Sequence, residues 1–165
     1  MNIAQVLLLD FDVEIANSRK VLERIPEHEP QWKPHDKSMA IGRLALHLAR
    51  LPRFCTQMLT TSHLDMAVTK FPDLIFESTA HLLSELELTA AEAKSHLEAA
   101  SDDHLREHWK LSFGERVFVD QPRMILYRTM FLNHMVHHRA QLGVYLRLQN
   151  IPVPALYGPS ADEPM

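Results

Sequence analysis

Apolar residues recur at helical spacing in four long segments of the chain, residues 3–24, 38–58, 78–100 and 127–149. Spacings of three and four positions place such residues on one face of an α-helix and leave the charged residues on the other. Four amphipathic helices can bury these faces against one another. The pattern therefore predicts an all-α, up-and-down type four-helix bundle with long irregular connections. No internal repeat divides the chain, so residues 1–165 are expected to form a single domain.

Proline residues indicate where the first two helices end or bend. Residues 26–37 contain three prolines, which predicts an extended connection over the surface, with Trp32 as its anchor. Ser38 is a candidate N-cap of the second helix. Pro52 has no N–H to donate to the carbonyl of Leu48, so we expect a kink about one turn after residue 47.

The remaining segments lack a helical period. Residues 60–77 are interpreted as a connection with at most a short helical turn. Residues 101–123 open with a possible capping turn at Ser101 and continue through β-favouring residues, which predicts a loop with an irregular hairpin. The proline-rich tail, residues 151–165, is expected to be extended, with Tyr157 fastening it to the body.

The segment 127–149 carries the most conspicuous chemistry. His134 and His138 lie one turn apart in its apolar stripe, so both imidazoles can converge on one small object such as a metal ion. A histidine on an apolar face is often only a core residue bonded to a carbonyl, and a metal site needs a third ligand. His137 could replace His138 as the partner of His134, but its position lies further toward the polar flank beside Arg128.

His47 is the candidate third ligand among the remaining histidines. It occupies the apolar row of the second helix between Leu44 and Leu51, where packing alone would favour a hydrophobic residue. His104 and His108 form another pair one turn apart, but without an apolar stripe, so a second metal site there is the weaker hypothesis.

Three other residues have both a structural and a chemical interpretation. Cys55 lies among apolar residues and is interpreted as a buried, inert thiol. Gln141 could support a histidine on its own helical flank or bond another helix, and the second role is favoured. Arg139 could bind an anionic substrate group, but an ion pair with a carboxylate of a neighbouring helix is favoured.

Composition excludes several classes of protein. With only 4 glycines, the chain has no glycine-rich phosphate loop, and the net charge of −4 without a Lys/Arg block disfavours nucleic-acid binding. No apolar run is long enough for a membrane span, and the N-terminus lacks the features of a signal peptide, so a cytoplasmic protein without membrane association is expected. The single cysteine excludes an internal disulfide.

Several stretches together resemble a known family. These are His47 on the second helix, NHMVHHRAQLGVYLR on the fourth, the closing VPALYGPSADE and the early LERIPEHEPQWKPHDKSM. They are similar to the DinB-like (damage-inducible) four-helix bundle proteins, which are also grouped with YfiT-like metalloenzymes. The similarity runs over nearly the whole chain.

The resemblance implies a divalent metal, nickel or zinc, held by one histidine of the second helix and two of the fourth. Carried onto this sequence, these are His47, His134 and His138, and His137 matches a family variant in which a second histidine precedes the ligand. The family is commonly homodimeric, and some relatives are transferases or isomerases that use a low-molecular-weight thiol. The resemblance thus implies a homodimeric enzyme that acts on a small molecule.

Three neutral imidazoles would leave a fourth coordination position for water or substrate. A metal held in this way could activate a bound water or hold a thiol as thiolate. The leading hypothesis is therefore a thiol-dependent transferase. Metal-dependent hydrolysis and a non-catalytic, metal-stabilised bundle are the alternatives, and the sequence identifies no general base.

Overall fold

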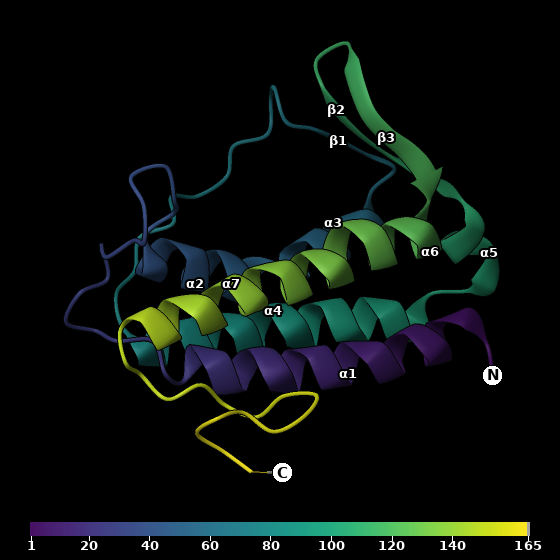
Figure 1. The fold of residues 1–165 in the computed structure, drawn as a ribbon. Helices are drawn as coiled ribbons and strands as arrows, with labels where there is room; N and C mark the ends of the chain where they lie inside the picture. Colours follow the sequence, from purple (N-terminus) through teal and green to yellow (C-terminus); the bar gives the residue numbers. More distant parts are fainter. Residues whose placement is uncertain (165) are drawn as a thin grey trace.

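The computed structural model describes residues 1–164, which form a mostly helical fold (Figure 1). Its long helices are α1 (Ile3–Leu22), α2 (Ile41–Arg50), α3 (Pro52–Thr60), α4 (Thr79–Ala99) and α7 (Asn133–Leu148). Helix α3 continues the direction of α2, and both pack against α4, while α1 contacts α4 and α7. The apolar faces meet between these helices, as the spacing predicted, and bury an extensive hydrophobic core.

The expected all-α class needs correction, because the chain also contains a three-stranded sheet. Strands β2 (His108–Phe113) and β3 (Arg116–Pro122) form the predicted hairpin at one end of the bundle. Strand β1 (His63–Asp65) pairs parallel to β2 and was not predicted. A strand of three residues has no period to detect, and it exists here because the neighbouring hairpin offers its edge.

The break after α2 follows the expected effect of Pro52. Helix α2 ends at Arg50, and Pro52 begins α3 at a position where its missing N–H costs nothing. The two helices carry His47 and the buried Cys55, respectively. The predicted irregularity is found one turn after His47, where the helix is interrupted at Leu51, although α3 continues the direction of α2.

The expected N-cap at Ser38 is wrong. Helix α2 begins at Ile41 after Ala40, which has no capping side chain. The first amides of the helix instead donate to backbone carbonyls of the preceding connection, from Ile41 to Trp32 (2.8 Å) and from Gly42 to Pro30 (2.9 Å). These bonds satisfy amides that a serine would otherwise cap, and they tie the connection to α2.

The segment 127–149 is helical but not uniformly α-helical. A short helix α6 (Arg123–Leu126) leads into a π-helical stretch, η1 (Tyr127–Leu132), before α7 begins. A π-turn contains more residues than an α-turn and so changes which residues share a face. The sequence predicted that His134 and His138 lie within one apolar stripe, and this prediction needs correction. Both are half-buried at the edge of the core, whereas Met135 and Arg139 lie inside it.

The connections are positioned largely as predicted. Trp32 packs edge-on against Tyr145, with ring centroids 5.6 Å apart, and so anchors the first connection. Ser101 caps the short helix α5 (Asp102–Arg106). The Tyr157 hydroxyl donates to the Glu14 carboxylate (2.7 Å) and fastens the tail to α1. Within residues 1–164, no helix is both long and apolar enough to cross a membrane.

Candidate metal centre

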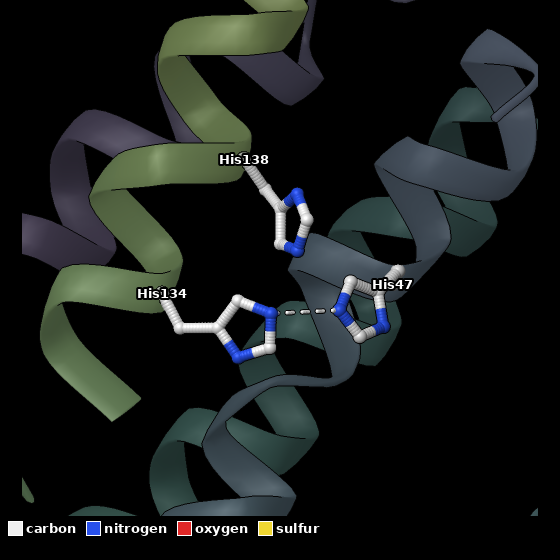
Figure 2. A group of neighbouring side chains, drawn as sticks. All are labelled: His47, His134 and His138. Carbon is white, nitrogen blue, oxygen red and sulfur yellow. Dashed lines mark hydrogen bonds between the residues drawn. The ribbon is translucent and has the colours of Figure 1, made fainter. Parts of the chain in front are cut away.

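Three histidine side chains from two helices point toward one another (Figure 2). His47 comes from α2, and His134 and His138 come from successive turns of α7. One ring nitrogen of each lies within 4.8 Å of the others, and the Nε2 atoms of His47 and His134 are 3.4 Å apart. The structure therefore brings together the three residues that the resemblance singled out.

The spacing of these nitrogens fits a metal ion. Zinc–nitrogen bonds of about 2.0 to 2.1 Å at tetrahedral angles place two ligand nitrogens about 3.4 Å apart. The His47–His134 separation already has this value, so these two nitrogens lie at the distance that a shared ion requires. The group contains no carboxylate, so the three ligands would leave the full charge of a divalent ion uncompensated.

Burial and mutual repulsion keep the imidazoles neutral. Burial, followed by the neighbouring His138, His134 and Arg43, lowers the pKa of His47 to about 4. Burial and His138 lower the pKa of His134, and burial likewise lowers the pKa of His138. A neutral imidazole has a free lone pair, which is the form that binds a metal.

Gln141 supports the cluster directly. Its Oε1 lies 2.8 Å from Nδ1 of His138, one turn away on α7, and accepts the proton of that nitrogen. This contact selects the tautomer in which Nε2 of His138 has its lone pair free. The favoured prediction, a bond from Gln141 to another helix, is therefore wrong, and the role beside a histidine is the one observed.

The other candidate histidines lie outside the cluster. His137 is exposed, with its ring centroid 4.9 Å from that of His138, and does not belong to the group. His104 contacts the Leu59 carbonyl (2.9 Å), and His108 pairs with Asp120 (2.8 Å). Among residues 1–164, His47, His134 and His138 form the one group of three or more potential metal ligands.

Arg139 and Cys55 have structural roles. The Arg139 guanidinium is buried against α1, where it donates to the Glu14 carboxylate and to Ser18 Oγ (3.2 Å). The predicted ion pair with a neighbouring helix is thus confirmed. Cys55 is fully buried, which raises the pKa of its thiol and keeps it protonated.

Comparison with solved structures identifies the fold. The chain matches a crystal structure of a DinB-like protein from Bacillus cereus ATCC 10987 with a TM-score of 0.68 and 20% sequence identity. This chain has a DinB-like fold. The match covers 92% of this chain and 95% of the other. A comparison with protein-family models gives no match, and no curated protein matches either.

The DinB-like fold and the histidine cluster agree with each other. The resemblance inferred from the sequence is confirmed at the level of the fold over nearly the whole chain. A cluster of three histidines within metal-binding distance on this fold fits a metal-binding protein.

Proposed function

We propose that this protein is a divalent-metal-dependent enzyme, with nickel or zinc as its metal, that transfers a low-molecular-weight thiol to a small electrophilic substrate. The observation that carries the proposal is the cluster of three neutral imidazoles at metal-binding spacing without a carboxylate. His47, His134 and His138 would hold the ion. A bound ion in such a site supplies Lewis acidity, which lowers the pKa of a coordinated thiol or water.

The chain's own residues support an open site rather than a closed structural one. Each of the three histidines is half-buried, so the cluster is reachable from solvent. Three protein ligands leave a position for a substrate atom, whereas structural zinc sites use four. Gln141 holds the His138 ring in one tautomer, which is the supporting contact expected of a metal-binding histidine.

In the proposed reaction, the thiol releases its proton to solvent, and its sulfur forms a bond to an electrophilic carbon of the substrate. The bond from that carbon to its leaving group breaks, and the leaving group departs with the bonding electrons. Hydrolysis through a bound water is the alternative that the same ligand set allows. Turnover in the absence of added thiol would identify it.

Metal analysis and thiol consumption together test this function. We expect plasma mass spectrometry to find about one nickel or zinc ion per chain, lost in His134→Ala and His138→Ala. His96→Ala is the matched control, because His96 is an exposed histidine of α4 far from the cluster in sequence. The loaded protein should consume bacillithiol, mycothiol or glutathione with an electrophile panel. A wild-type protein that takes up neither metal would refute the enzyme.

A homodimer, a cytoplasmic location and the absence of nucleic-acid partners belong to the same proposal. The first and last helices expose aliphatic side chains that could form an interface: Val6, Leu9 and Val13 on α1, and Val144 and Leu148 on α7. Light scattering measures the assembly. We expect a mass of two chains, reduced to one by a charge at the interface, such as Leu9→Glu or Val144→Glu.

A further inference from the structure

A pocket of about 280 Å³ lies at the start of α2, and its lining residue Arg43 is one helical turn before His47 of the histidine cluster. Its lining residues are Gln31, Lys33, Ser38, Met39, Ala40, Arg43, Leu74 and Phe76. Two of them are cationic and two carry neutral polar groups, and none is acidic. This composition is notable in a chain with 21 acidic residues and a net charge of −4.

Close packing fixes the walls of the pocket. A Cβ atom at Gly42 would lie 2.7 Å from Cβ of Phe76 and 3.0 Å from Cβ of Pro30, so only glycine permits both contacts. The amides of Ile41 and Gly42 already donate to carbonyls of the first connection. The positive character of the pocket therefore comes from side chains rather than from free amides of the helix.

Arg43 supplies a positive charge without a counterion. Its side chain is exposed, and among residues 1–164 it has no hydrogen bond or ion pair with another side chain. Lys33 is partly engaged, because its Nζ donates to the Asp36 carbonyl (2.9 Å) and lies 4.0 Å from the Asp36 carboxylate. About one unpaired positive charge remains, which matches a single carboxylate group of a ligand better than a phosphate that carries two charges on one group.

The pocket and the cluster lie within the length of one small molecule. Arg43 precedes His47 by four residues on α2, so the two side chains leave the same face about 6 Å apart along the helix. Helical side chains lean toward the N-terminus, which directs Arg43 from the cluster toward the pocket. A guanidinium binds a carboxylate through two parallel hydrogen bonds, and Leu74 and Phe76 provide an apolar wall beside it.

We propose that this pocket binds a carboxylate of the small molecule whose reactive end reaches the three histidines, with Arg43 as the principal contact and Lys33 and Ser38 as secondary ones. This inference rests on the proposed function, which places the reactive end of the molecule at the histidines. Binding of the carboxylate by the pocket needs no metal. The carboxylate could belong to the thiol or to the electrophilic substrate.

The first experiment is a nuclear magnetic resonance titration of the metal-free protein with glutarate and with its neutral diamide, glutaramide. Glutarate should shift the amide signals of residues 31–43 and 74–76, and glutaramide should bind about tenfold more weakly. Arg43→Gln should weaken glutarate binding about tenfold, because a charged hydrogen-bonded contact is lost. Lys33→Gln should weaken it about two- to threefold. Arg116→Gln on the hairpin is the matched control.

Three results would overturn the proposal: equal affinity for glutarate and glutaramide, shifts centred elsewhere, or unchanged glutarate binding in Arg43→Gln.

A second experiment distinguishes the two sources of the carboxylate. Cobalt-loaded protein is titrated with mercaptohexanoate and mercaptohexanol, and the thiolate–cobalt absorption is followed. A preference for mercaptohexanoate that Arg43→Gln abolishes assigns the carboxylate to the thiol. Equal affinities for the two thiols, together with unchanged glutarate binding, assign the carboxylate to the electrophilic substrate.

The two experiments can fail separately. If the protein binds neither nickel, zinc nor cobalt, the proposed enzyme fails, and the glutarate titration still decides whether the pocket binds carboxylates. If cobalt and thiols bind but glutarate does not, the enzyme stands and the carboxylate pocket is refuted.

Discussion

His138 and Arg139 are neighbours in sequence on α7, but they belong to two polar clusters of opposite kind. Arg139 is 1% exposed and is bonded to the Glu14 carbonyl (3.0 Å), the Glu14 carboxylate, Ser18 and Tyr157. His138 is half-buried, with one nitrogen bonded to Gln141 and the other directed at two more imidazoles. In the first cluster the charged groups are paired with each other, whereas the second holds three imidazoles joined by a single Nε2–Nε2 contact of 3.4 Å between His47 and His134.

This difference separates a structural cluster from a binding site. A buried charge is tolerated only when partners satisfy it, and here Glu14 and Tyr157 do so while they fasten the tail to the bundle. Neutral imidazoles that face one another gain little from their mutual contact. A cation between them would use all three lone pairs, which is why we assign binding to the histidine cluster.

The largest expected effect comes from breaking the structural cluster. Arg139→Met leaves the Glu14 carboxylate buried without its cation, which should cost about 3 to 5 kcal/mol of unfolding free energy. Urea denaturation measures this loss. The double variant Arg139→Met/Glu14→Leu should recover much of it, because no charge then remains buried. Metal affinity should change little, and its loss in Arg139→Met would show that the two clusters are not independent.

Removing a histidine of the cluster should lower metal affinity strongly and change the stability of the metal-free protein less. We expect His47→Ala to lower the affinity for nickel or zinc by at least about 100-fold, a loss at least as severe as that of a supporting residue. Isothermal titration with competing chelator measures the affinity, and His96→Ala is the control. Stability of the metal-free protein should change by less than in Arg139→Met. Wild-type affinity in His47→Ala would remove His47 from the site.

Sequence periodicity predicted the main helices because their apolar faces are long and regular. It did not predict β1, whose three residues are ordered by pairing with β2, a contact with residues far along the chain. It also missed the π-helical turn η1, because a single additional residue per turn leaves no mark in an apolar pattern.

The candidate site was predictable to a similar degree. The helical spacing of His134 and His138 brought two imidazoles together, and the apolar row of α2 made His47 conspicuous. The pocket beside Arg43 gave no comparable signal, since its walls come from three separate segments. Close packing of Phe76 on Gly42 brings two of these segments together, and no local pattern encodes that contact.

A smaller effect is expected at Gln141, which acts on the site through His138. Gln141→Ala frees the His138 ring to rotate or change tautomer, so we expect metal affinity to fall about tenfold. Gln141→Glu keeps an acceptor at the same position and should retain most of the affinity. Unfolding free energy of the metal-free protein should stay within about 0.5 kcal/mol of the wild type. Equal losses in both variants would show that Gln141 serves packing instead.

The smallest effect concerns protons, which compete for the same lone pairs. Because the pKa of His47 is about 4 in the folded protein and 6.5 without its surroundings, the unfolded chain takes up the proton first as the pH falls. Acidification from pH 7 to pH 5 should therefore destabilise the metal-free protein. His47→Gln should remove about 1 kcal/mol of that loss, a modest value because the ring is half-buried.

Urea denaturation at both pH values measures this difference, with His96→Gln as the control for an exposed histidine. Carboxylates contribute little in this interval because their ordinary pKa values lie below it. The double variant Arg139→Met/Glu14→Leu should lower stability by the same amount at pH 7 and pH 5, since it removes both members of the ion pair and leaves no unpaired carboxylate that could titrate. A wild-type pH dependence retained in His47→Gln would show that the cluster does not exclude protons, and the contrast with the Arg139 cluster would then be lost.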